Sequence, residues 1–203
     1  MVKPLLIAFE GIDGSGKTTQ ITNCYHWLKS LGLSALMTRE PTDGEYGKLI
    51  RAASRRLDPE TEERLFELDR RQHVQRVIQP ALDAGVIVLI DRYFYSSVAY
   101  QGTRSGVDRM QNVLQSNSFA PPADIVIYLD VSVDQALERI RRNRPNTDVF
   151  ETQENLERVR RGYDWILGQH PCAHRIDASK SPKEIEALVI PSIYAGLRGV
   201  VHF

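Results

Sequence analysis

Residues 9–20 read FEGIDGSGKTTQ, and this stretch decides the fold. It follows the apolar run LLIAF (residues 5–9), which is typical of a strand that is buried on both faces. Three glycines then precede a lysine and two threonines, and a helical pattern begins at residue 17. Such a loop points successive backbone N–H groups inward, and the dipole of the following helix adds positive potential. The stretch therefore predicts a cradle for phosphate groups.

The cradle fits a specific motif. Gly11, Gly16, Lys17 and Thr18 match G-x-x-x-x-G-K-[ST] in the strand–loop–helix context that the motif requires. Lys17 would reach the β- and γ-phosphates of a nucleoside triphosphate, and the Thr18 hydroxyl would bind Mg²⁺. The residues expected to bind ATP are Gly11, Asp13, Gly14, Ser15, Gly16, Lys17, Thr18 and Thr19. The alternative, an ordinary glycine-rich turn, does not account for the strand and helix on either side.

Length and composition limit the class of protein. The 203 residues are 42% hydrophobic and fit one domain over residues 1–203, with 26 basic residues balanced by 26 acidic ones. This balance argues against a non-specific binder of nucleic acid or of an acidic membrane. Cys24 and Cys172 are too few for a metal cluster or a disulfide framework, and the apolar start is too short for a signal peptide or a membrane span. We expect a cytoplasmic protein.

Strand and helix patterns alternate along the chain. Strands are expected at 5–9, 34–38, 86–90, 124–130 and 173–177, and helices at 17–31, 45–56, 59–84, 95–116, 132–142, 151–168 and 182–197. The apolar strands suit burial on both faces of a parallel sheet, with helices as the crossover connections. The sequence therefore predicts an α/β fold with three layers, in which a central five-stranded parallel sheet is flanked by helices.

The pair Asp91-Arg92, which follows the predicted strand 86–90, helps to distinguish three classes of protein that use such a cradle. A switch GTPase would need Asn-Lys-x-Asp to read guanine, and the sequence contains no Asn-Lys pair. A hydrolysing ATPase commonly ends its second key strand in Asp-Glu, whereas the run VIVLI is followed by Asp91-Arg92. A carboxylate at this position can hold magnesium or its water, and an arginine beside it suits an anion. We therefore favour a kinase whose acceptor is a second phosphate.

A run of arginines follows the predicted helix 132–142. The stretch RIRRNRPNTDVFE (residues 139–151) contains Arg139, Arg141, Arg142 and Arg144 before a Pro-Asn turn. Taken alone, these arginines are most simply the solvated face of a helix. Beside a phosphate site, they indicate a mobile basic lid at about residues 141–150.

Taken together, these stretches resemble one family, the thymidylate kinases. The resemblance rests on FEGIDGSGKTTQ, TREPTDGEYGKLIR, LFELDRRQ, DRYFYSSVAYQG and PPADIVIYLDV, in this order and with similar spacing. It implies a P-loop nucleoside monophosphate kinase that converts dTMP and ATP into dTDP and ADP, with Mg²⁺ as the cofactor. A homodimer is implied as well.

The resemblance also assigns roles. Arg92 would grip the acceptor phosphate, which suits its two-pronged guanidinium, Phe66 would stack on thymine, and Arg70 would meet the carbonyl edge of the base. Helical spacing independently places positions 66 and 70 on one face. The full set expected to bind dTMP is Asp13, Arg39, Arg51, Phe66, Arg70, Arg92, Ser97, Tyr100 and Gln101. Thr18 and Asp91 would bind the metal.

The chain differs from some relatives in the source of the catalytic arginine. Eukaryotic relatives carry a basic residue in the cradle where this chain has Gly14, so the resemblance assigns that duty to the lid. The expected catalytic residues are Lys17, Arg92, Arg141, Arg142 and Arg144. Two alternatives remain: a monophosphate kinase with another base preference, and a nucleotide-binding regulatory protein that does not turn over.

Overall fold

The computed structural model describes residues 4–53, 57–143, 152–168 and 170–198. Its strands are β1 (Leu6–Glu10), β2 (Ala35–Arg39), β3 (Ile87–Asp91), β4 (Ile125–Asp130) and β5 (Ala173–Asp177). The α-helices are α1 (Lys17–Ser30), α2 (Glu45–Ala53), α3 (Pro59–His73), α4 (Gln79–Asp83), α5 (Phe94–Tyr100), α6 (Val107–Ser116), α7 (Val133–Asn143), α8 (Gln153–Leu167) and α9 (Pro182–Arg198).

The sheet is parallel throughout and has the strand order β2-β3-β1-β4-β5. β1, β3 and β4 form its centre, and nearly all of their side chains are buried. β2 lies at an edge and is partly exposed. The prediction of a five-stranded parallel sheet is confirmed, and it follows from the doubly buried apolar strands.

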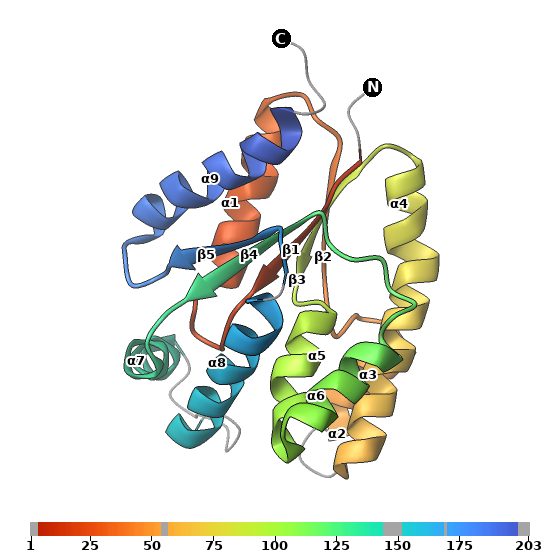
Figure 1. Cartoon of the computed structure of the whole chain (residues 1–203). Helices are drawn as coiled ribbons and strands as arrows, with labels where there is room; N and C mark the ends of the chain where they lie inside the picture. Colours follow the sequence, from red (N-terminus) through yellow and green to blue (C-terminus); the bar gives the residue numbers. More distant parts are fainter. Residues whose placement is uncertain (1–3, 54–56, 144–151, 169, 199–203) are drawn as a thin grey trace.

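Helices cover both faces of this sheet and make three layers (Figure 1). α1 and α9 pack on one face, and α4, α5 and α8 lie on the other, with α2, α6 and α7 farther out. The phosphate loop joins β1 to α1 at the carboxyl edge of the sheet, where β3 also ends. Ligands of parallel α/β proteins bind at this edge, so the fold brings the predicted site residues toward one place.

Two predicted helices differ in detail from the structure. The helix expected over 95–116 is interrupted: α5 is followed by a 3₁₀ turn at Gly102–Ser105, and α6 begins after Gly106, whose φ is +87°. The helix expected over 59–84 is continuous, but its middle turn, Val74–Ile78, is a π-helix between α3 and α4. The π-helix keeps the long segment helical, whereas the 3₁₀ turn coincides with residues 101–106, QGTRSG, which contain no apolar side chain and two glycines.

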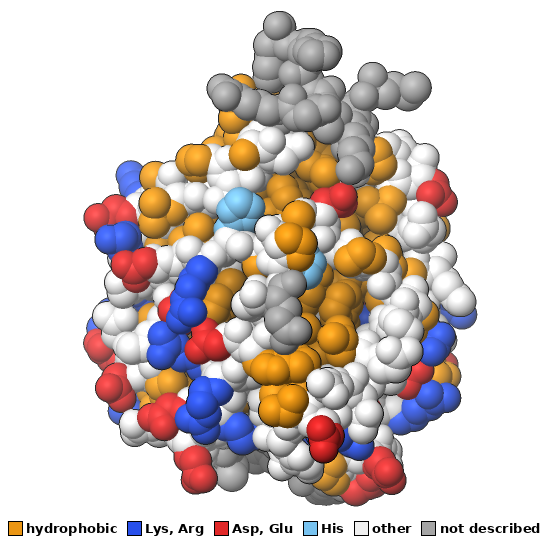
Figure 2. Space-filling model, viewed as in Figure 1, with side chains coloured by type: hydrophobic (Ala, Val, Ile, Leu, Met, Phe, Trp, Pro, Cys, Tyr) orange, Lys and Arg blue, Asp and Glu red, His pale blue; other side chains and the backbone are white. Residues whose placement is uncertain are grey.

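The surface is mixed in charge. Figure 2 shows basic and acidic side chains interspersed around the edges of one face of the molecule, in keeping with the balanced composition. Within the described ranges, no helix is both long and apolar enough to cross a bilayer.

Candidate active site

The phosphate loop is folded as the motif requires. Gly11, Gly14 and Gly16 all have positive φ, at +147°, +79° and +97°. A Cβ at Gly11 would lie 2.7 Å from the carbonyl oxygen of Leu129, and one at Gly14 would lie 2.5 Å from that of Ala136. The loop is therefore held closely against β4 and α7, and only glycine fits at these two positions.

Lys17 is buried at the first turn of α1 and points back into the loop. Its Nζ donates to the carbonyl oxygens of Gly11 and Ile12 at 3.0 and 2.9 Å. Burial and, to a smaller extent, the charge of Arg92 lower the pKa of Lys17, whereas Asp13 raises it. The resulting pKa is about 8. The lysine is thus positioned by the loop itself, and negative phosphate oxygens would favour its charged form.

Thr18 and Asp91 meet where α1 begins and β3 ends. Thr18 Oγ1 donates to Asp91 Oδ2 at 3.0 Å. Hydroxyl and carboxylate oxygens are ligands that Mg²⁺ accepts. The described residues contain no group of three or more His, Cys, Asp or Glu side chains that could hold a metal ion. The pair therefore fits a magnesium ion that takes its other ligands from phosphate and water.

Arg92 stands between the phosphate loop and α5. Its Nη2 donates to Asp13 in the loop and, at 3.2 Å, to the hydroxyl of Tyr100, whose ring lies 4.9 Å from the guanidinium carbon. Its Nη1 lies 3.4 Å from the carbonyl oxygen of Gly11. The structure thus brings together three residues predicted from the sequence, namely Asp13, Arg92 and Tyr100, and sets a cation directly beside the predicted triphosphate cradle.

Arg70 is completely buried in a second polar cluster. Its Nε and Nη2 contact Glu40 Oε2 at 2.8 and 2.7 Å, its Nη2 donates to Ser97 Oγ at 3.0 Å, and its Nη1 donates to Asn117. Among the described residues, three of the five guanidinium N–H groups donate hydrogen bonds, one each to Glu40, Ser97 and Asn117. Glu40 in turn lies 3.1 Å from Nδ1 of His73. The cluster fixes the plane of the guanidinium.

Two predicted base-contacting residues have notable environments. Gln101 is buried, and its Oε1 has no hydrogen-bond partner among the described residues. Phe66 is half-buried, and it is not among the described residues that pack into the hydrophobic core. An orphaned acceptor and a half-exposed aromatic ring suit a ligand better than they suit the core.

Arg39 and Arg51 converge on one carboxylate. Arg39 Nη2 lies 2.8 Å from Asp43 Oδ1, and Arg51 Nη2 lies 3.1 Å from the same oxygen. Both arginines are exposed, and neither contacts Arg92 within the part of the chain that the structure describes. The structure therefore pairs both arginines with Asp43 rather than with the Arg92 cluster.

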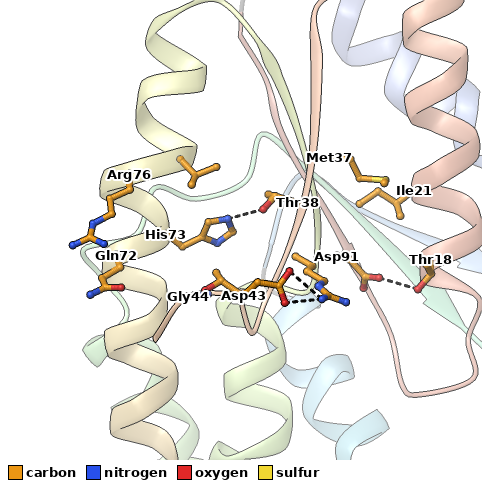
Figure 3. A pocket seen from close by; sticks show the side chains of 13 residues that line it. Thr18, Ile21, Met37, Thr38, Asp43, Gly44, Gln72, His73, Arg76 and Asp91 are labelled. Atoms are coloured by element: carbon orange, nitrogen blue, oxygen red, sulfur yellow. Dashed lines mark hydrogen bonds and ion pairs between the residues drawn. The ribbon is translucent and has the colours of Figure 1, made fainter. Parts of the chain in front are cut away.

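A cavity of about 590 Å³ opens beside this region (Figure 3). It is lined by Thr18, Ile21, Met37, Thr38, Arg39, Thr42, Asp43, Gly44, Gln72, His73, Arg76, Val77 and Asp91. In Figure 3, Gln72, His73 and Arg76 project from the α3 side, and Thr18 faces Asp91 across from them. The cavity is lined in part by Thr18 and Asp91. Neither Phe66 nor Arg70 lines it, so the cavity is separate from the pocket predicted to bind the base.

Only some of the predicted lid arginines lie among the described residues. Arg141 and Arg142 lie exposed in the last turn of α7, where Arg142 pairs with Glu138 at 2.7 Å. Arg144 lies outside the described residues, as does most of the lid predicted at 141–150. Arg139, from the same run, contacts the phosphate loop: its Nη1 lies 3.5 Å from the carbonyl oxygen of Gly14, and its Nη2 donates to that of Ala178 at 2.9 Å.

Sequence reasoning did not single out the residues that surround the buried Arg70 and the half-buried Arg92. These are Glu10, Glu40, Ser96, Asn117 and Tyr163. Glu10 and Glu40 each follow or end an apolar strand, which is the one signal that could have marked them as buried carboxylates. The contacts of Asn117 and Tyr163 join distant parts of the chain and have no local signature.

The strand order, the glycine loop with its lysine and threonine, and the carboxylate and arginine that end β3 define a P-loop kinase. Comparison with known proteins makes this more specific. A family model described as thymidylate kinase matches residues 9–189. The chain belongs to the thymidylate kinase family.

Relatives from distant organisms align along nearly the whole chain. A probable thymidylate kinase of Pyrococcus horikoshii is 39% identical over 202 residues, covering 96% of this chain and 98% of the relative. A thymidylate kinase of Akkermansia muciniphila is 42% identical over 189 residues, covering 92% and 90%. One from Xanthomonas campestris is 41% identical over 205 residues, covering 98% and 88%.

Proposed function

We propose that this protein transfers the γ-phosphoryl group of ATP to the phosphate of dTMP, giving ADP and dTDP. The observation that carries the proposal is the position of Arg92. It pairs with Asp13 and lies 3.4 Å from the carbonyl oxygen of Gly11, so a phosphate held by Arg92 would lie against the loop that cradles ATP. Phosphoryl transfer needs chiefly this alignment of donor and acceptor.

On the donor side, the loop from Gly11 to Thr19 would hold the phosphates of ATP through backbone N–H groups and the start of α1. Lys17 would exchange its contacts with Gly11 and Ile12 for phosphate oxygens and neutralise charge on the transferred group. Thr18 and Asp91 would hold Mg²⁺, which when bound neutralises and orients the phosphate oxygens.

On the acceptor side, Arg92 would bind the phosphate of dTMP with its guanidinium fork, and Tyr100 would support the deoxyribose beneath it. The acceptor phosphate is already an oxyanion at neutral pH, so this scheme requires no general base from the protein. Arg39 and Arg51, held by Asp43, would approach the same phosphate from the loop before α2.

The base would be read by the second cluster. Arg70 would donate to the thymine carbonyl with an N–H group that does not donate to Glu40, Ser97 or Asn117, and it would disfavour the amino group that cytosine carries at this edge. Gln101 Oε1, which lacks a partner in the described structure, would accept from the ring N–H of thymine. Phe66 would stack on the ring.

The lid would complete the site. Arg141 and Arg142 lie in the last turn of α7 and Arg144 follows it in the sequence, and α7 packs against the phosphate loop at Gly14, so an arginine from this run would reach the transferred phosphoryl group when the lid closes. Closure would also exclude water and prevent hydrolysis of ATP. We further propose that residues 1–203 act as one domain with this lid, that two copies form a homodimer, and that the enzyme works in the cytoplasm.

A product assay tests the proposal against its alternatives. The purified chain is incubated with ATP, Mg²⁺ and dTMP, and ADP and dTDP are quantified by chromatography. We expect equal amounts of the two products, and very little ADP when dTMP is left out. ADP without dTDP would indicate a hydrolysing ATPase. Binding of ATP without any product would indicate the regulatory protein that does not turn over.

A further inference from the structure

Glu10, the last residue of β1, is a buried carboxylate that the proposed mechanism does not use. It is fully buried, and both of its oxygens accept hydrogen bonds. Oε1 accepts from the backbone N–H of Tyr93 at 2.8 Å, and Oε2 accepts from the hydroxyls of Ser96 and Tyr163 at 2.6 and 3.0 Å. Each of these three donors lies next to Arg92: Tyr93 follows it in the sequence, and Ser96 and Tyr163 contact its side chain.

The two hydroxyls connect Glu10 to the guanidinium of Arg92. Arg92 Nη1 donates to Ser96 Oγ at 3.2 Å and to the Tyr163 hydroxyl at 3.3 Å. The Ser96 and Tyr163 hydroxyls also lie 2.8 Å from each other, and either can be the donor in that contact. When both donate to Glu10, their lone pairs face the guanidinium. Glu10 and Arg92 therefore form an ion pair that is bridged by two hydroxyl groups.

The backbone of Arg92 depends on the same strand. Arg92 has a φ of +66°, the left-handed region that residues with a Cβ seldom adopt. The N–H of Arg92 donates to the carbonyl oxygen of Phe9 at 3.1 Å, and the next N–H, that of Tyr93, donates to Glu10. The turn that directs the Arg92 side chain across the phosphate loop is thus fixed on both sides by the end of β1.

We propose that Glu10 is a positioning residue for Arg92, which it orients through the backbone of Tyr93 and through the hydroxyls of Ser96 and Tyr163. This inference rests on the proposed role of Arg92 in binding the acceptor phosphate. Asp13 and Tyr100 hold Nη2, and the two hydroxyls that contact Glu10 hold Nη1. These contacts together fix the orientation of the guanidinium group.

A neutral amide cannot take the place of this carboxylate. Both oxygens of Glu10 face donors, so glutamine must turn its NH₂ group either toward the N–H of Tyr93 or toward the two hydroxyls. In the first orientation, the NH₂ group of glutamine faces the N–H of Tyr93, and two donors cannot form a hydrogen bond with each other. The second reverses the hydroxyls, whose protons would then face Arg92. Burial raises the pKa of Glu10, Ser96 and the charge of Arg92 oppose the rise, and the resulting pKa is about 7, so the carboxylate form predominates only above that pH.

Glu10→Gln tests this role by steady-state kinetics with dTMP and ATP varied separately. We expect kcat/KM for dTMP to fall about tenfold or more, while KM for ATP stays within about twofold. Asp124→Asn is the matched control, because Asp124 Oδ2 accepts from the N–H of Leu6 at 2.8 Å at the other end of the same strand. The control should leave both constants unchanged. Equal losses for dTMP and ATP in Glu10→Gln would contradict the proposal.

A double-mutant cycle separates this inference from the proposed function. If Glu10 acts through Arg92, adding Glu10→Gln to Arg92→Ala should change kcat/KM for dTMP by less than about twofold. The same loss in both backgrounds would overturn the inference and leave the role of Arg92 intact. No effect of Arg92→Ala alone would instead refute the acceptor-phosphate role, and with it this inference.

Ser96→Ala provides a second perturbation in case Glu10→Gln does not fold. It removes one bridging hydroxyl and keeps the carboxylate and the contact with Tyr93. We expect a smaller fall in kcat/KM for dTMP, about threefold, again without a change in KM for ATP. Unchanged constants in Ser96→Ala would contradict the bridged arrangement.

Discussion

Arg70→Met should reveal how much stability the buried Arg70 contributes. The Arg70 side chain is 1% exposed and its partner Glu40 3%, so the substitution leaves a buried carboxylate that still contacts His73 but has lost its arginine. Breaking one side of a buried ion pair costs about 3–5 kcal/mol. Ser97 and Asn117 also lose a charged hydrogen-bond donor. We therefore expect the free energy of unfolding to fall by at least ~3 kcal/mol.

The assay is equilibrium unfolding in urea, followed by circular dichroism, with the slope against urea compared between variants. Arg64→Met is the control on the same helix: Arg64 pairs with Glu67 at 2.8 Å, but its side chain is 65% exposed, so its loss should cost less than ~1 kcal/mol. Replacing Glu40 by Gln together with Arg70→Met should recover part of the loss, because no uncompensated charge remains. A cost below ~1 kcal/mol for Arg70→Met would refute the buried ion pair.

Other perturbations address catalysis, the sugar and pH. Lys17→Ala should lower kcat by several orders of magnitude with the fold retained in circular dichroism, and near-normal activity would exclude the ATP assignment. Alanine at Arg141 or Arg142 should lower kcat more than it raises KM for dTMP if that arginine meets the transition state, which single-variant kinetics can decide. Tyr100→Ala should erase most of the preference for deoxyribose, on the order of a hundredfold, whereas Tyr100→Phe should keep it; an unchanged sugar ratio in the alanine variant would make Tyr100 a core residue. The pKa of Glu10 rises from 4.5 to about 7 on folding, so between these pH values the folded protein binds a proton that the unfolded chain releases. The free energy of unfolding should therefore fall by up to ~1.4 kcal/mol per pH unit as the pH rises from 5 to 7, when compared with that of Glu10→Gln.

The fold could be predicted from the sequence because its signals are local. Apolar runs bounded by breakers located every strand, and Gly32 and Gly85, which the sequence marked as helix ends, have φ values of +73° and +76°. Ser181 and Pro182 begin α9 as expected, with Ser181 N donating to Glu184 Oε2 at 2.9 Å. The 3₁₀ turn and Gly106 within the predicted helix 95–116 were not predicted, because the helical patterns on either side were joined across residues 101–106, QGTRSG, which contain no apolar side chain.

The candidate site could be predicted only in part. A motif places Lys17 and Thr18 in the phosphate loop, and a strand end places Asp91 beside Thr18. The contacts that orient Arg70 depend on residues 30 and 47 positions away, Glu40 and Asn117, which only the folded chain brings together. The same is true of the contact between Glu10 and Tyr163, 153 positions apart. Sequence patterns therefore located the groups that would touch ligands, and the structure was needed to find those that hold them in place.

The most direct test of the account is the relative kcat/KM of the purified protein for dTMP, dCMP, dAMP and dGMP, with ATP and Mg²⁺ saturating. We expect dTMP to be preferred over dCMP by at least about a hundredfold, because in the proposed arrangement Arg70 and the Gln101 acceptor would face carbonyl and N–H groups that cytosine does not present in the same pattern. In Arg70→Met, measured at matched folded fraction, this preference should largely disappear. Equal activity with dTMP and dCMP in the unmodified protein would contradict the assignment of thymidylate as the acceptor.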